Sequence, residues 1–266
     1  MKRLADKFFI FVILFVIISW IIIYLIDLRN IFGLRDIIFS VEPYYFFFPY
    51  LPFVFQHWGR GNGIAEILQL FCLGGAGLMA AFCAGKIYGQ RLFKFWAIMS
   101  VAFVLMLLED AGDIRHLIMS YVQVIFKEPD QAFWGTGVEL LYFLVLAGIP
   151  TYALIKYYSD IKEFSKAKIY LLIGFVFYAI AQSLSFVGTA FEGLMDKNVY
   201  TLMGDKLYDI ALSIGDSGLA ERWSDSGFPI SFYLMDGLIE ESLELIGAGA
   251  FFAATLSFLI ICLTSE

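Results

Sequence analysis

The feature that most constrains this chain is a series of apolar runs, several of them longer than about 18 residues and almost free of charge. A run of that length crosses a bilayer as a helix, because a helix satisfies its own backbone hydrogen bonds where there is no water. The chain is 61% hydrophobic, against about 45–50% for soluble domains. We therefore expect an all-α, polytopic transmembrane helix bundle rather than a soluble protein with an anchor.

Six spans are predicted within a single integral membrane domain that covers residues 1–266. They lie at about 8–26, 63–85, 94–126, 132–155, 168–190 and 230–263. The first should be an uncleaved span, because no small-residue cleavage site follows it. Lys and Arg concentrate before the first span and in the connections near 86–94 and 156–168, so the positive-inside rule predicts that both termini are cytoplasmic. The outer loops are then 27–62 and 191–229.

The three cysteines lie inside apolar runs, at Cys72, Cys83 and Cys262. Cys72 and Cys83 are about 16 Å apart along one helix at 1.5 Å per residue, which is too far for a disulfide. We interpret all three as small buried hydrophobic residues. The net charge of −7 is not that of a nucleic-acid-binding protein.

Each outer loop contains one distinctive segment. The first is rich in aromatic residues near 42–58, and its prolines prevent a regular helix. It is either an interfacial aromatic loop or a lid that brings His57 near a buried ligand. In the second loop, apolar and charged residues alternate over 199–214 in the pattern of a short interfacial amphipathic helix.

Two clusters of small residues predict close helix packing. Gly74–Gly77 lies in the second span and Gly247–Ala250 in the sixth. Small side chains let helices approach closely in lipid, so we expect both segments to be packing faces.

Acidic residues inside two spans are the main functional signal, because a charge at membrane depth costs roughly 2.5–3.5 kcal/mol on insertion scales. On one continuous helix, Glu109, Asp113 and His116 fall within an arc of about 60°. Glu240 and Glu244 share a face of the last span. We expect these two helices to face each other and to build one acidic site from these five residues. The flanking candidates are Asp110, Arg115, Glu139, Glu192, Asp236, Glu241, Glu66 and His57.

So many carboxyl groups either stay protonated or share a cation, and a divalent metal ion is the simplest solution. The candidate metals are Mn, Fe, Mg, Ca and Zn. Because most of the predicted ligands are oxygen atoms, the site suits Mn, Fe, Mg or Ca better than Zn. The pattern is similar to helix-bundle di-metal sites, although those use Glu-x-x-His where this chain has Asp113-x-x-His116. Arg115 has a structural alternative as an ion pair with Asp110 or with an acid on another helix. A structural alternative also exists for three of the glutamates, which are then solvated residues at span ends: Glu66, Glu139 and Glu192.

Three short motifs carry a resemblance to a family. They are Glu109-Asp110 followed by His116, Gly188-x-x-x-Glu192, and Glu240-Glu-x-x-Glu244-x-x-Gly247. Together they resemble a loosely defined set of uncharacterised bacterial multi-pass membrane proteins. The resemblance implies a location in the bacterial cytoplasmic membrane and no known activity.

Three functional classes remain open. The first is a membrane-embedded metalloenzyme that acts on a lipid-phase or interfacial small molecule, with no catalytic residue assigned. The second is a cation or proton-coupled transporter, and the third is a structural subunit of a membrane complex. The acids all lie at middle to outer depth, whereas the cytoplasmic halves are apolar. We therefore expect a site closed toward the cytoplasm, where Thr255 and Ser257 play no part in transport.

Overall fold

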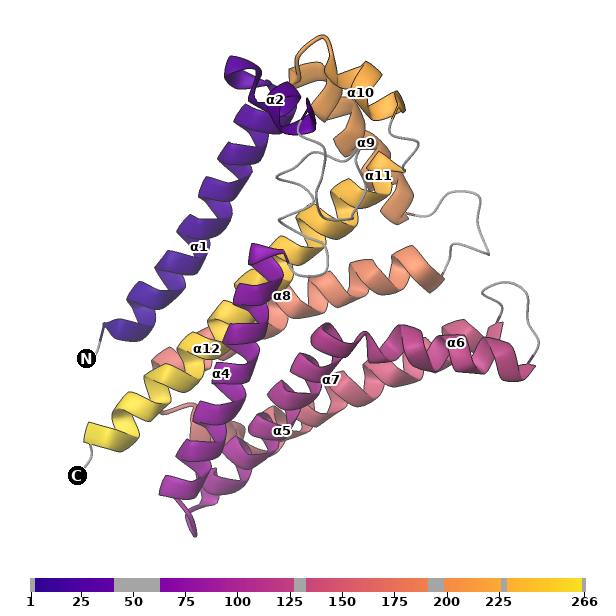
Figure 1. Cartoon of the computed structure of the whole chain (residues 1–266). Coiled ribbons are helices and arrows are strands. Elements are labelled where there is room, and N and C mark those ends of the chain that lie inside the picture. The colour runs from indigo at the N-terminus through magenta and orange to yellow at the C-terminus, as the bar shows by residue number, and fades with distance from the viewer. Residues whose placement is uncertain (1–2, 41–62, 127–132, 191–198, 226–228, 265–266) are drawn as a thin grey trace.

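The computed structural model describes residues 3–40, 63–126, 133–190, 199–225 and 229–264, which form helices and no strand (Figure 1). Six segments are long and apolar enough to cross a membrane, which confirms the predicted all-α multi-pass bundle. These segments are Leu4–Leu28, Ile64–Lys86, Arg91–Gly112, Gly137–Ile161, Ser165–Gly188 and Ile230–Thr264. The two ends of the chain lie at the same end of the bundle (Figure 1). That this end is cytoplasmic stays a prediction from the Lys and Arg distribution.

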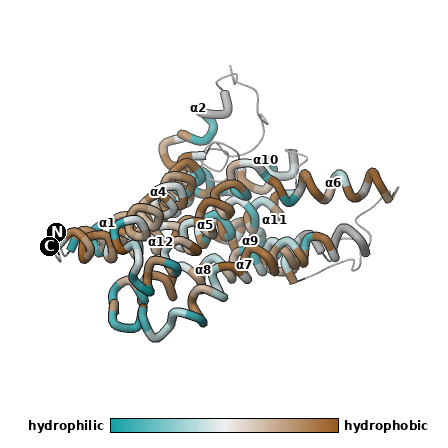
Figure 2. The backbone as a smooth tube through the Cα atoms, turned by 90° about the horizontal axis from the view of Figure 1, so that it is seen from below, coloured by the Kyte–Doolittle hydropathy of each residue, from teal (hydrophilic) through white to brown (hydrophobic). Residues whose placement is uncertain are grey.

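Several spans contain more than one helical element. In chain order the elements are α1 (Leu4–Ile23), the π-helical turn η1 (Tyr24–Leu28), the 3-10 turn η2 (Ile31–Gly33), α2 (Leu34–Ser40), α4 (Ile64–Lys86), α5 (Arg91–Gly112), α6 (Ile114–Phe126), α7 (Phe133–Ile161), α8 (Ser165–Ala190), α9 (Val199–Ile214), α10 (Leu219–Asp225), α11 (Ile230–Tyr233), the π-helical turn η3 (Leu234–Glu240) and α12 (Glu241–Thr264). Hydrophobic residues dominate the long helices, as Figure 2 shows.

The last span lies at the centre of the bundle, where α12 packs against α1, α4 and α8. Small residues make this packing close. A Cβ atom added to Gly247 would lie 3.2 Å from the backbone oxygen of Gly174 on α8, and one added to Gly249 would lie 2.9 Å from Val12 on α1. The structure thus confirms that this glycine-rich segment is a packing face. The segment in α4 has the same role, because Ser100 Oγ on α5 donates a hydrogen bond to the Gly77 backbone oxygen at 2.9 Å.

The half of the bundle that holds both chain ends is filled by aromatic side chains. Trp96 on α5 stacks against Phe258 on α12 with ring centroids 4.6 Å apart, and Phe103 contacts Phe251 at 5.1 Å. Trp96, Phe103 and Phe251 are fully buried. Aromatic side chains therefore fill the space between α5 and α12 in this half, as its apolar sequence predicts.

The third span differs from its prediction. The sequence predicts a continuous helix over 94–126, but α5 ends at Gly112 and the backbone of Asp113 is left-handed, with φ of 47°. A residue in this conformation is a common helix stop, and the Asp113 amide donates to the Glu109 backbone oxygen at 2.8 Å. The chain then begins α6, which projects away from the bundle (Figure 1). Glu109, Asp113 and His116 therefore do not lie along one continuous helix face.

A cap of short helices covers the other end of the bundle. The Arg35 guanidinium on α2 is buried, donates to the Asp27 backbone oxygen at 2.8 Å, and holds both carboxylate oxygens of Asp216 at 3.0 Å. The predicted amphipathic helix is present as α9, and its Gly204 lies against the backbone of Ser231 on α11. This packing holds α9 beside the last span. The aromatic segment near 42–58 lies outside the described residues.

Candidate functional site

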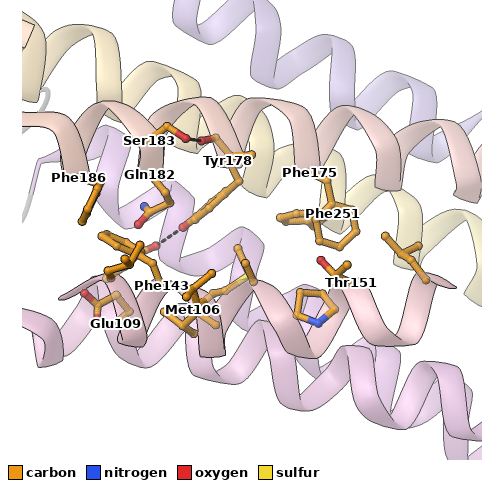
Figure 3. Close-up of a pocket in the computed structure, with 18 of the residues that line it drawn as sticks. Met106, Glu109, Phe143, Thr151, Phe175, Tyr178, Gln182, Ser183, Phe186 and Phe251 are labelled. Carbon is orange, nitrogen blue, oxygen red and sulfur yellow. Dashed lines mark hydrogen bonds between the residues drawn. The ribbon is translucent and has the colours of Figure 1, made fainter. Parts of the chain in front are cut away.

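A cavity of about 520 Å³ lies among α5, α7, α8 and α12 (Figure 3). Its lining is mostly apolar. The lining residues are Met106, Glu109, Asp110, Leu140, Phe143, Leu144, Leu146, Ala147, Pro150, Thr151, Leu154, Phe175, Tyr178, Ala179, Gln182, Ser183, Phe186, Val187 and Phe251. Polar groups are concentrated toward one end: Figure 3 shows Glu109 and Gln182 there, and Phe175, Phe251 and Thr151 toward the other. The cavity therefore has a polar end and an apolar end.

The side of the cavity between α7 and α8 is open. Leu144 on α7 lines it and is 60% exposed, and Ala147, Ala179 and Ser183 on the same two helices are also exposed. The exposed surface of an apolar span faces lipid. The cavity thus opens sideways, between two of the helices that are long and apolar enough to cross a membrane.

A hydrogen-bond network at the polar end joins four spans through the amide of Gln69. Its Nε2 atom donates to Asp110 Oδ2 at 2.7 Å and to Glu244 Oε2 at 2.9 Å. The Tyr178 hydroxyl donates to the same Asp110 oxygen at 2.6 Å, and Gln182 Nε2 donates to Glu244 Oε1 at 2.7 Å. Both carboxyl groups are thus held by neutral donors from α4 and α8.

The Arg115 guanidinium organises a second network beside the cavity. It lies 3.7 Å from Glu109 Oε1 and 3.3 Å from Glu139 Oε1, and it donates to Ser185 Oγ at 3.1 Å. The Tyr142 hydroxyl donates to Glu109 Oε2 at 2.5 Å. Arg115 therefore ties α6 to α5, α7 and α8. This arrangement fits the structural ion pair that the sequence offered as an alternative, although the pairing acids are Glu109 and Glu139 rather than Asp110.

Glu240 lies at the end of the π-helical turn η3 and is buried. The Tyr200 hydroxyl on α9 donates to its Oε2 atom at 3.4 Å, and Ser185 also hydrogen-bonds the Glu240 carboxyl group. Burial and the nearby Glu240 carboxyl group raise the pKa of Tyr200, so this phenol remains a donor at neutral pH. Ser185 thereby connects the Arg115 network to the last span. Such π-turns are often found at functional sites.

The five predicted metal ligands occupy different surroundings. Glu109 is held by Arg115, Asp113 is an exposed helix stop, and Glu240 and Glu244 have separate donors. The His116 side chain lies outside the described part of the structure. Within the described residues, no group of three or more His, Cys, Asp and Glu side chains is arranged to hold a metal ion. A single metal site built from all five stays a prediction.

The flanking candidates are also spread over the site. Asp110 and Glu139 are parts of the two networks, and Asp236, Glu66 and Asp110 all lie near enough to Glu241 to interact with it electrostatically. Glu241 Oε2 is buried without a hydrogen-bond partner in the described structure. Glu192 and His57 lie outside the described residues.

The neutral donors of the site are not among the residues that the sequence predicts. These are Gln69, Tyr142, Tyr178, Gln182 and Ser185. Two glutamines inside apolar spans are a usable signal, because an amide in hydrocarbon needs a polar partner. Tyrosine and serine are common in spans, so the other three donors emerge only from the packing.

No family model matches this chain, and no curated protein or solved structure is similar to it. Its function is therefore inferred from the geometry of the cavity and of the two networks.

Proposed function

We propose that this membrane protein binds an amphipathic lipid-phase molecule in the cavity among α5, α7, α8 and α12. The carrying observation is that an apolar cavity opens sideways between α7 and α8 and has Glu109 and Asp110 at its polar end. A molecule that diffuses in the bilayer can enter there without crossing water. Its apolar part would lie along Phe175 and Phe251, and its polar end would meet the carboxyl groups.

The size and character of the cavity support this proposal. Small-molecule sites are typically concave, of about 300–1,000 Å³, and mostly apolar with a few polar groups that fix orientation. The cavity volume of about 520 Å³ lies within that range. Asp110 is held between Gln69 and Tyr178, and Glu109 between Arg115 and Tyr142. The polar end is therefore positioned in advance of binding.

The test uses a photoreactive probe, a dodecanol analogue with an alkyl diazirine, added to the full-length protein in lipid nanodiscs. Light should attach the probe to residues of α7 and α8 that line the cavity. Ala147→Phe and Ala179→Phe fill the cavity and should abolish this labelling. Ile180→Phe is the matched control, because Ile180 is 46% exposed on the same helix and does not line the cavity. Equal labelling of all four proteins would contradict the proposal.

A metal-dependent enzyme is the second candidate, and the crowding of carboxyl groups favours it. Glu240, Asp236 and Asp110 all interact electrostatically with Glu241. A divalent ion held there would relieve that repulsion and supply a Lewis acid; of these four acids, Asp110 lines the cavity. This candidate needs ligands beyond the described carboxyl groups, such as His116.

The packing of the half of the bundle that holds both chain ends supports a closed site rather than a transport pathway. Ions need polar ligands along the whole route, whereas Trp96, Phe103, Phe251 and Phe258 fill this half. The Thr255 hydroxyl is buried and donates to the Phe252 backbone oxygen of its own helix at 2.9 Å.

A further inference from the structure

The polar end of the cavity has more carboxyl groups than basic groups. All the donors to Asp110 and Glu244 in the described structure are neutral, namely Gln69, Tyr178 and Gln182. The guanidinium of Arg115 is already shared between Glu109 and Glu139. The carboxyl group of Asp110, which lines the cavity, therefore has no basic partner among the described residues.

The amide of Gln69, which donates to Asp110 but does not itself line the cavity, also has an unused acceptor. This side chain is 1% exposed, and its Nε2 atom serves both Asp110 and Glu244. Its Oε1 atom is buried and has no hydrogen-bond partner in the described structure. One amide thus supplies donors to two acids while its own acceptor is left unused. A ligand that brings donors and positive charge is complementary to this end, and one that brings a carboxylate or phosphate is not.

We propose that the molecule bound in the cavity is a long-chain amine whose protonated nitrogen donates hydrogen bonds to Asp110. This inference rests on the proposed function and names the chemical class of its ligand. An ammonium group carries its own donors and needs no cage of three anionic ligands, which the described residues do not provide. A hydrogen bond between a charged donor and a carboxylate is about twice as strong as a neutral one, and stronger again away from water.

The remainder of the cavity fits an unbranched apolar tail. On α8 the lining runs from Val187 to Phe175, which is about 18 Å at 1.5 Å per residue. Phe251 contacts Phe175 with ring centroids 5.0 Å apart, and Leu154 and Pro150 also line the cavity; none of these residues carries a charge. A headgroup at Asp110 would leave the tail along these residues. This matches one polar nitrogen followed by an extended alkyl chain.

The experiment compares three competitors with identical tails: dodecylamine, dodecanol and dodecanoate. Each is titrated against photolabelling by the diazirine dodecanol probe in phosphatidylcholine nanodiscs, with its bilayer concentration measured on empty nanodiscs. Dodecylamine should compete at least about tenfold more strongly than dodecanol, a difference of the size that one charge-assisted contact supplies. Dodecanoate should compete most weakly.

Variants then locate the preference. Asp110→Asn keeps the shape of the side chain and should reduce the advantage of the amine to less than about threefold, without weakening dodecanol. Glu244→Gln removes the carboxyl group that shares the Gln69 donor with Asp110, and it should reduce the advantage of dodecylamine over dodecanol in part. This variant replaces Asp110→Asn in the test if Asp110→Asn does not fold. Ile180→Phe should keep the full advantage.

The two proposals fail in different ways. If the probe labels the cavity and dodecanol competes as well as dodecylamine, the amine proposal is overturned and the binding of an amphiphile stands. If the amine preference persists unchanged in Asp110→Asn and Glu244→Gln, the assignment of the headgroup to Asp110 is overturned. If no amphiphile labels the cavity, the proposed function itself fails, and the amine proposal fails with it.

Discussion

The guanidinium of Arg115 on α6 lies 3.3 Å from the carboxylate of Glu139 on α7, and both side chains are buried. The same guanidinium lies 3.7 Å from Glu109 on α5, next to the cavity. A buried charge is tolerated only when it is paired, because water no longer solvates it. Arg115 thus makes the polar end of the cavity compatible with the bilayer.

Removing this guanidinium should be strongly destabilising. Arg115→Met leaves Glu109 and Glu139 buried beside each other without their partner, at an expected cost of about 3–5 kcal/mol. The control is Arg91→Met, because Arg91 pairs with Asp160 at 2.9 Å but is 67% exposed. That exposed pair should contribute less than about 1 kcal/mol. Thermal unfolding of the two variants in the same detergent makes the comparison. Equal losses would show that the Arg115 pairs are dispensable.

The amide of Gln69 should matter more than that of Gln182. Gln69→Leu removes donors to both Asp110 and Glu244, whereas Gln182→Leu removes one donor to Glu244 alone. Leaving buried acceptors unsatisfied costs about 1–3 kcal/mol each, so the Gln69 variant should unfold at the lower temperature. The opposite order would argue against Gln69 as the centre of this network.

The close contact of α8 with α12 should not tolerate a methyl group. In Gly247→Ala the new Cβ would lie 2.8 Å from the Tyr178 ring and 3.2 Å from the Gly174 oxygen. Overpacking of this kind costs about 1–3 kcal/mol. Gly148→Ala is the control on α7, because nothing lies within 4 Å of its added Cβ. A helix gains up to about 1 kcal/mol from that change. A neutral Gly247 variant would contradict the described packing.

Metal binding is tested by unfolding the protein with Mn, Fe, Zn, Ca or Mg at two pH values. Ligating carboxylates must be ionised and His116 neutral, so any stabilisation by an ion should weaken as the pH falls. Glu240→Gln and His116→Ala should remove it, while Ser257→Ala should keep it. Absence of stabilisation by all five ions would leave the amphiphile site without a metal.

The sequence is sufficient to predict the spans and the acids within them, but not the places where a helix breaks. Length and hydropathy locate all six spans, because lipid leaves few alternatives to an apolar helix. They do not reveal the stop at Asp113, since apolar residues such as Leu117 and Ile118 continue beyond it. The Gly112-Asp113 pair is the only local hint, as such residues adopt left-handed backbone readily.

The candidate site shows the same division. Glu109 and Glu244 are conspicuous in the sequence because charges are rare in spans. Their partners are not, because Gln69, Tyr142 and Gln182 come from other helices, and only the packing brings them together. The π-helical turn over Leu234–Glu240 also changes which side chains share a face, and hydropathy carries no sign of it.

The most direct test of the central claim is an experimental structure of the full-length protein in lipid nanodiscs with dodecylamine. The account predicts elongated density within the cavity between α7 and α8, with its polar end at Asp110 and its tail toward Phe175. A cavity filled by water or by protein side chains, with the amphiphile elsewhere, would contradict it.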